Sequence, residues 1–264
     1  MPEISRLFEK DSYTAEISYL TNVFIYEYDI SKCNINILYT KGIIDKETYD
    51  MLYSSPRMKR QVYVGMLQKD ANVAKTLSLG IKEARELFFK ANNLQYRDIL
   101  SIKKDAIFII NKQIQNTDFG LIKFVRKNVY TSFYRLSNLE LYYYYNNMDK
   151  SEYIDVKGIS KKLYLHEGYF IQILKDIFYC IQTNGPEVSL EMIKEIYNKY
   201  ITRQFPIEYY REFDAASSYA LGNSIYKLES ASEDDKYRIN INKNLFILMQ
   251  IQRIVVNMYF NKYR

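Results

Sequence analysis

Two aspartates, Asp29 and Asp105, interrupt apolar stretches that otherwise have the composition of buried strands. Asp29 ends the run "VFIYEYD", and Asp105 stands after "ILSIKK" and before "AIFII". Two carboxylates at the ends of adjacent strands can hold a pair of Mg²⁺ ions about 3.5–4 Å apart, which stabilise both sides of an in-line phosphoryl displacement. Magnesium also takes water and phosphate oxygens as ligands, so few protein ligands suffice. We therefore predict that the two aspartates lie on neighbouring strand ends and share a metal site.

A basic segment, "RMKRQVYVGMLQ", lies between the two aspartates, and a lysine pair directly precedes the second of them. Arginine binds phosphate oxygens through two parallel hydrogen bonds, whereas lysine acts as a point charge. The residues predicted to line one phosphate-binding face are Arg57, Lys59, Arg60, Lys103 and Lys104. The formal net charge of +6 permits a nucleic-acid partner without requiring one.

Each of these residues also fits an ordinary structural role. Asp29 can cap the helix that follows it, because aspartate accepts hydrogen bonds from the free backbone N–H groups at a helix start. Asp105 suits a hairpin turn. The basic residues can form the solvated faces of a helix and of a turn. The residue types alone leave both explanations open.

The elements that would position the two aspartates are strands. The segment Val23–Tyr28 is aromatic and β-branched, which predicts a strand. Two more strands flank Lys103–Asp105, either as a hairpin or as one bent strand. The stretch "LIKFVRKNVYTSFYRLSNLELYYYY" alternates in polarity and predicts a further pair that turns near Ser137–Asn138.

Helices are predicted between these strands and after them. Residues 43–53 have helical spacing, with Asp45 placed as an N-cap and Pro56 beyond the end. Residues 57–89 are again helical, with a break near 69–72. Three amphipathic segments dominate the last hundred or so residues: "HEGYFIQILKDIFYCIQ", "PEVSLEMIKEIYNKYI" and "NKNLFILMQIQRIVVNMYFNKY". The fold class is therefore predicted to be α+β, an antiparallel sheet with a short helical insertion followed by a helical domain.

The scarcity of metal-binding and membrane-spanning features excludes several protein classes. Cys33 and Cys180 are far apart and His166 is the only histidine, which excludes a disulfide scaffold and a Cys/His zinc site. No apolar run approaches the length that spans a bilayer, and "MPEISRLFEKDSY" lacks the apolar core of a signal peptide. We therefore expect a cytoplasmic protein with no membrane partner, in a bacterium or a phage-infected cell.

The order of these motifs resembles that of the family B DNA polymerases, particularly the compact viral type. "YEYDISKCNINILY" is similar to the first motif of that family, an aspartate followed by a loop that opens a helix. "RMKRQVYVGML" is a weaker match to the finger helix that binds the nucleotide. "IKEARELFFKANNLQYRDILSIKKDAIFII" resembles the helix and strand around the third motif, Asp-Thr-Asp-Ser, and "YIDVKGIS" resembles the Lys-Gly segment. The resemblance covers roughly Val23 to Ile201.

This resemblance implies a palm-like domain over residues 1–150, with short fingers at about 41–98, and a helical thumb-like domain over 151–264. It implies that Asp29 and Asp105 are the catalytic and metal-binding residues, with Mg²⁺ as the cofactor. Lys157, in the Lys-Gly segment, joins the residues that bind nucleotide or nucleic acid. The implied partners are DNA and a second polymerase subunit that carries the missing exonuclease half.

Several residues depart from the family pattern. Lys103 stands where the family has the first aspartate of its third motif, Lys104 and Ala106 replace the threonine and the serine, and Asn34 replaces the tyrosine that screens the sugar. Three functional hypotheses follow. The first is half of a split polymerase, active in nucleotidyl transfer within a complex, which the retained aspartate pair favours. The second is an inactive palm-like scaffold that binds nucleic acid or a replication protein, which the departures favour. The third, the interaction-protein hypothesis, is a virus–host interaction protein that has reused the scaffold.

Overall fold

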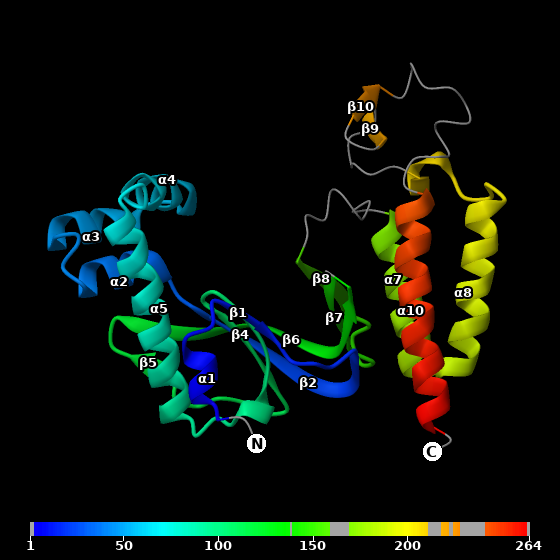
Figure 1. Cartoon of the computed structure of the whole chain (residues 1–264), viewed down its shortest axis with the longest axis horizontal. Coiled ribbons are helices and arrows are strands. Elements are labelled where there is room, and N and C mark those ends of the chain that lie inside the picture. The colour runs from blue at the N-terminus through cyan, green and yellow to red at the C-terminus, as the bar shows by residue number, and fades with distance from the viewer. Residues whose placement is uncertain are drawn as a thin grey trace. The chain divides into compact units, whose positions relative to one another are not determined.

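The computed structural model combines helices with an antiparallel sheet (Figure 1), which confirms the predicted α+β class. The structure describes residues 3–137, 139–158, 169–210, 218–221, 224–227 and 241–262. His166 lies outside the described residues. Within the described part of the chain, every helix is too short or too polar to cross a lipid bilayer.

The strands form one large sheet and one separate hairpin. They are β1 (Ser12–Thr14), β2 (Tyr19–Ile30), β3 (Ile99–Lys103), β4 (Ala106–Ile110), β5 (Asp118–Phe119), β6 (Ile122–Leu136), β7 (Leu139–Tyr145), β8 (Glu152–Gly158), β9 (Ser218–Leu221) and β10 (Ser224–Lys227). The order in the large sheet is β1-β3-β4-β2-β6-β7-β8, with β5 paired to β6, and β9 pairs with β10. The strands around Lys103–Asp105 are therefore a hairpin, and the predicted turn near Ser137 is confirmed.

A short helix that the residue pattern did not predict precedes β1, and the other helices fall between β2 and β3 and after β8, as the pattern predicts. They are α1 (Ser5–Phe8), α2 (Cys33–Thr40), α3 (Lys46–Ser54), α4 (Arg57–Leu67), α5 (Ala71–Ala91), α7 (Tyr169–Thr183), α8 (Pro186–Ile201) and α10 (Ile241–Lys262), with 3₁₀ turns η1 (Tyr96–Asp98) and η2 (Ile207–Tyr210). Asp45 caps α3 by accepting a hydrogen bond from the Thr48 N–H. Asp70 caps α5 at the break between α4 and α5. Both local predictions are confirmed.

The chain divides into two compact units. One comprises Met1–Glu16 and Val23–Val129, and the other comprises Ile17–Asn22 and Tyr130–Arg264. The predicted boundary, at residue 150, falls between β7 and β8, which both belong to the second unit. The palm and thumb division at that point stays a prediction.

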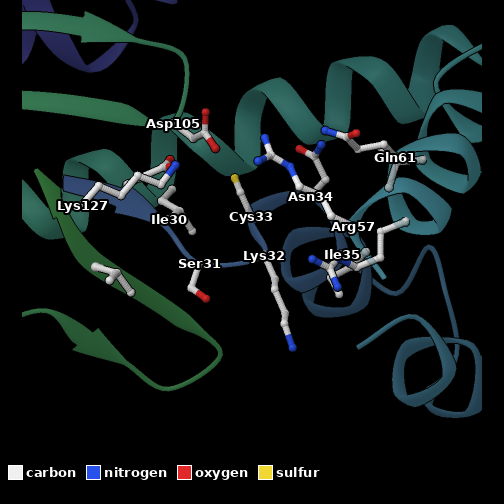
Figure 2. Close-up of a pocket in the computed structure, with 14 residues that line it drawn as sticks. Ile30, Ser31, Lys32, Cys33, Asn34, Ile35, Arg57, Gln61, Asp105 and Lys127 are labelled. Atoms are coloured by element: carbon white, nitrogen blue, oxygen red, sulfur yellow. The ribbon is translucent and has the colours of Figure 1, made fainter. Parts of the chain in front are cut away.

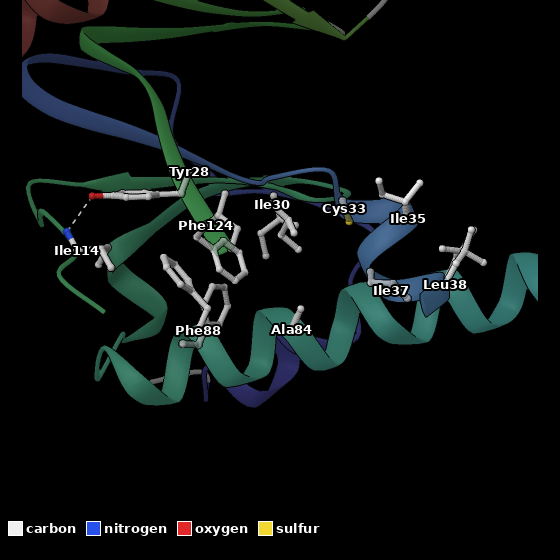
Figure 3. Close-up of a cluster of buried hydrophobic side chains, with 14 of the residues drawn as sticks. Tyr28, Ile30, Cys33, Ile35, Ile37, Leu38, Ala84, Phe88, Ile114 and Phe124 are labelled. Carbon is white, nitrogen blue, oxygen red and sulfur yellow. Dashed lines mark hydrogen bonds between the residues drawn. The ribbon is translucent and has the colours of Figure 1, made fainter. Parts of the chain in front are cut away.

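The core of the first unit lies between α5 and the strands (Figure 3). The rings of Phe88 and Phe124 stack with centroids 4.1 Å apart, and Tyr28 packs against Phe88 at 5.7 Å. The Tyr28 hydroxyl accepts a hydrogen bond from the Ile114 N–H at 2.9 Å. These contacts fix the C-terminal half of β2, the strand that carries Asp29, against α5.

A glycine brings α5 into close contact with α2. A Cβ atom built on Gly80 would lie 2.3 Å from the Cγ2 atom of Ile37, a buried residue of α2. Only a residue without a side chain fits there while Ile37 keeps its place. The packing of α2, which begins directly after the loop that follows Asp29, therefore depends on this glycine.

The second unit has a core of its own around β6–β8 and the helices α7, α8 and α10. Tyr134 and Phe178 stack with ring centroids 4.1 Å apart and planes 5° apart. The predicted amphipathic helices are observed here, and α8 matches its predicted segment residue for residue.

Candidate functional site

A cavity of about 470 Å³ lies in the first unit, where β2 ends and α2 begins (Figure 2). Its walls come from the loop between these two elements, from α4, from the β3–β4 turn and from β6. The charged residues that line it are Asp29, Lys32, Arg57, Arg60, Asp105 and Lys127. Its volume falls within the range of about 300–1,000 Å³ that is usual for small-molecule sites.

The strand register explains why both aspartates reach this cavity. Asp29 of β2 lies opposite Ala106 of β4, and Lys103 of β3 lies opposite the same Ala106. Lys104 and Asp105 form the two-residue turn of the β3–β4 hairpin. Asp105 therefore directly precedes Ala106, the residue that lies opposite Asp29. The structure brings the two predicted aspartates to one cavity, and a shared metal ion stays a prediction.

Asp29 is buried and only partly hydrogen-bonded. It is 9% exposed, and its Oδ2 atom accepts a hydrogen bond from the ammonium of Lys127 on β6. Its Oδ1 atom is buried without any hydrogen-bond partner. Burial of a carboxylate oxygen without a hydrogen-bond partner costs free energy, so we expect a ligand to bind this atom. Asp29 is not a helix cap, because α2 begins after Lys32 and has no side-chain cap.

Asp105 is half-buried on its turn, beside a buried arginine. Burial raises the pKa of the Asp105 carboxyl, while the nearby charges of Lys104, Arg85 and Arg57 act in the opposite direction. The turn residue Lys104 has a φ of 55°, in the left-handed region. Its carbonyl accepts a hydrogen bond of 2.6 Å from the Arg85 guanidinium. Asp105 is therefore a turn residue, as its ordinary role predicts, and also a wall of the cavity.

Arg85, on α5, fixes the turn that carries Asp105. Its guanidinium donates hydrogen bonds to the carbonyls of Leu7, Phe8, Lys10 and Lys104. Arg85 is 1% exposed, and burial lowers its pKa. It thus connects the turn to the end of α1 and to the segment that follows this helix, and it holds a positive charge near Asp105.

The cations of the cavity outnumber its carboxylates. Four cationic residues and two carboxylates line it, which gives the walls a net positive charge and suits an anionic ligand. Arg57 and Arg60 come from the start of α4, and Arg60 also donates to the Ser55 carbonyl. Lys32 donates a hydrogen bond of 2.8 Å to the Tyr53 carbonyl. Lys127 pairs with Asp29.

The other predicted basic residues lie elsewhere. Lys59 is exposed on α4, and Lys104 is exposed on its turn. Lys103 reaches toward β1, where its ammonium lies 3.1 Å from the Thr14 hydroxyl. Lys157, on β8 of the second unit, pairs with Asp155 at 2.6 Å. None of these four residues is among those that line the cavity.

Lys32 and Lys127 are site residues that sequence reasoning missed. Lys32 follows Asp29 by three residues, so its proximity in the chain was an available signal. Lys127 follows Asp29 by 98 residues, and only the pairing of β6 with β2 brings the two together. No local pattern in the sequence reveals that register.

The donor set of the cavity suits a hard cation that keeps some of its own ligands. Among the described residues, no three His, Cys, Asp or Glu side chains gather as they would in a site made wholly by protein. Mg²⁺ is commonly bound by one or two carboxylates together with water and substrate phosphates. The free Oδ1 atom of Asp29 and the carboxyl of Asp105 match that requirement.

Fold and site together define a mixed α+β protein whose antiparallel sheet ends at a cavity with two carboxylates and an excess of cations. The chain belongs to the family described as Bacteriophage PBS1 gene 130 protein, whose model matches residues 3–257. The prediction of a phage protein is therefore confirmed. No curated protein matches the sequence. The finer assignment, to the family B DNA polymerases, stays a prediction.

Proposed function

We propose that this chain is a polymerase-like phage protein that binds a nucleotide and DNA with Mg²⁺, and that it serves as the palm and thumb half of a split enzyme. The observation that carries the proposal is the buried, unpartnered Oδ1 atom of Asp29. Asp29 is one of the residues that line the cavity, together with Asp105 and four cationic residues. Carboxylates and cations together suit a complex of a metal ion with a polyphosphate better than carboxylates alone or cations alone would.

The residues of the cavity have distinct roles in this proposal. Asp29 and Asp105 would hold the metal, and Arg57 and Arg60 would contact phosphate oxygens through paired hydrogen bonds. Lys127 would fix the Asp29 side chain, because it binds the Oδ2 atom and leaves Oδ1 for the metal. The metal, when bound, would neutralise the charge that develops on the transferred phosphoryl group.

A second candidate function is an inactive scaffold that binds polyanions or a replication protein without catalysis. The ion pair between Lys127 and Asp29 favours it, since the ammonium already neutralises one of the two presumed metal ligands. The lysine at position 103 does not add to this argument. Its ammonium is directed toward Thr14 on β1.

Metal binding and primer extension separate these candidates. We expect isothermal titration of the chain with Mn²⁺ and dATP to show binding that Asp29→Asn and Asp105→Asn each weaken at least tenfold. Asp176→Asn, at an exposed position on α7, is the matched control and should bind as the native chain does. Failure of the native chain to bind would remove the metal-site proposal.

Primer extension with Mg²⁺ or Mn²⁺ tests catalysis by the isolated chain, and we expect little or none. Robust extension that Asp105→Asn abolishes would make the chain a polymerase by itself. Binding without extension would support the inactive scaffold, or a split enzyme that needs its partner chain. Lys103→Asp should leave extension unchanged, because residue 103 is directed away from the cavity.

A further inference from the structure

An exposed row of apolar side chains follows one face of α4, a helix that lies at the top of the first unit in Figure 1. The row consists of Met58, Val62 and Met66, which are 72%, 58% and 63% exposed. Residues four apart on a helix are neighbours on its surface, so these three side chains form one continuous row, the α4 row. Single exposed apolar residues are common, whereas apolar side chains that gather on one face are typical of a contact site.

A different face of α4 closes the cavity described above. The α4 residues that line the cavity are Arg57, Arg60, Gln61 and Val64, and no member of the α4 row is among them. Val64 is also the buried residue of this helix. The fold and the cavity therefore use one face of α4, and the row on the other face is exposed.

Gly65 lies three residues after Val62, on the face that carries the α4 row, and the fold does not explain it. A Cβ atom built on Gly65 would meet nothing within 4 Å beyond its own helix, and its φ is outside the left-handed region. Glycine within a helix is less favourable than alanine. At Gly80, in contrast, a Cβ atom would collide with Ile37. The missing side chain at position 65 serves no packing inside the unit, but it lets another helix approach the backbone of α4 closely.

The charge around the α4 row is positive. Residues 51–69 contain four basic residues, Arg57, Lys59, Arg60 and Lys69, and no aspartate or glutamate. Lys59 and Lys69 are exposed, and they lie close to the two ends of the row in the chain. A partner with carboxylates beside its apolar residues would complement this surface. A second copy of the chain would instead bring like charges together, which is unfavourable.

We infer that the α4 row, Gly65 and the two exposed lysines dock an acidic amphipathic helix of another protein. A helix suits the row, because helices pack along rows of residues four apart, and methionine adapts its shape to a partner. A lipid surface suits it less, because helices that lie on membranes present Trp, Phe or Leu. The inference goes beyond the proposed function, since it concerns another face of α4 and stands whether or not the cavity binds a metal.

The test uses two synthetic peptides that share an apolar seam and differ in charge. Both have about three heptads with leucine at positions a and d; one has glutamate and the other lysine at positions e and g, so that each repels its own copies. Binding to the full chain is measured by fluorescence anisotropy without metal or nucleotide. We expect the glutamate peptide to bind saturably and more weakly as salt is added, and the lysine peptide to bind at least tenfold more weakly.

Substitutions distinguish docking on the α4 row from general attraction between charges. Val62→Gln and Met66→Gln should each weaken binding of the glutamate peptide about tenfold, the usual effect at a central contact residue. Gly65→Leu should weaken binding as much without lowering the midpoint of urea unfolding, because its side chain enters open space. The double variant Lys59→Glu/Lys69→Glu should reverse the preference between the two peptides.

The matched control is Leu87→Gln, at an exposed position near the end of α5, which should bind the glutamate peptide as the native chain does. Absence of binding, equal affinity for the two peptides, or an unchanged affinity in Val62→Gln would each overturn the inference. Two other results would replace its occupant and so overturn it as well. One is self-association of the native chain in sedimentation that Val62→Gln abolishes, and the other is binding to phosphatidylglycerol vesicles that the same variant abolishes.

Discussion

Removal of Lys127 from its ion pair with Asp29 should lower the free energy of unfolding. The burial of the two side chains allows us to estimate by how much. Lys127→Met keeps a long side chain but leaves a buried carboxylate with neither oxygen hydrogen-bonded. Loss of one partner from a fully buried pair costs roughly 3–5 kcal/mol, whereas an exposed pair contributes about 0–1 kcal/mol. The Asp29 side chain is 12% exposed and that of Lys127 50%. We therefore expect a loss of about 1–2 kcal/mol in the free energy of unfolding.

A double-mutant cycle with Asp29→Asn isolates this interaction. Asp29→Asn removes the charge that Lys127 neutralises, so Lys127→Met should cost little in that background. The measured coupling should be about 1 kcal/mol in free energies from urea unfolding followed by far-UV circular dichroism. Saturating Mn²⁺ should restore stability to Lys127→Met, because a ligand that binds only the folded state stabilises it.

The control lies on the same strand. Lys123 forms an ion pair with Asp118 in which both side chains are more than half exposed, so Lys123→Met should produce no measurable loss. Additive free energies in the Lys127–Asp29 cycle would refute the reasoning. In that case solvent already stabilises the Asp29 carboxylate, and its free Oδ1 atom no longer argues for a ligand.

Three further predictions concern the turn, the pH dependence and the DNA partner. Arg85→Met should lower the free energy of unfolding by about 2–4 kcal/mol, because four backbone carbonyls lose a buried donor; unchanged stability in urea would contradict the role of Arg85 in fixing the turn. Burial raises the pKa of Asp105 in the folded chain above the ordinary aspartate value of about 4. The shift should therefore stabilise the fold in full at pH values below about 4, and this stabilisation should disappear as the pH rises through the raised pKa. The unfolding midpoint measured against pH should show this fall in the native chain, and a fall that persists in Asp105→Asn would assign it to another group. Affinity for a primer–template, measured by fluorescence anisotropy, should fall linearly with salt on logarithmic axes and less steeply in Arg57→Ala/Arg60→Ala; no binding even at low salt would favour the interaction-protein hypothesis.

Local signals in the sequence were sufficient for much of the fold. The Asp45 cap and the break before α5 follow from residues within a few positions of one another. The two strands around Lys103–Asp105 were predicted in the same way, although the sequence left open whether they form a hairpin or one bent strand. The association of Asp29 with Asp105 was predictable as well, since each interrupts a strand-like run in a matched way. Strand composition and turn chemistry act over short distances, so they can be recognised without knowledge of the tertiary structure.

The parts of the site that depend on strand register could not be predicted. Lys127 meets Asp29 only because β6 adds to the sheet beside β2, and a shift of one residue would turn its side chain to the other face. The direction of Lys103 is set in the same way, by the pairing of β1 with β3. The capping role considered for Asp29 was wrong because the chain continues for three residues before α2 begins.

The contact between Gly80 and Ile37 ties the sequence of α5 to the shape of a cavity whose walls contain no residue of α5. Isoleucine is branched at Cβ and has little rotamer freedom in a helix, so it cannot turn aside for a larger neighbour. A side chain at position 80 would displace α2 and, with it, the residues from Lys32 to Ile35 that open that helix. Members of the family should therefore vary at these two positions together, with a smaller residue at 37 wherever 80 is not glycine. Chains that keep the cavity should obey this rule even where their surfaces have diverged.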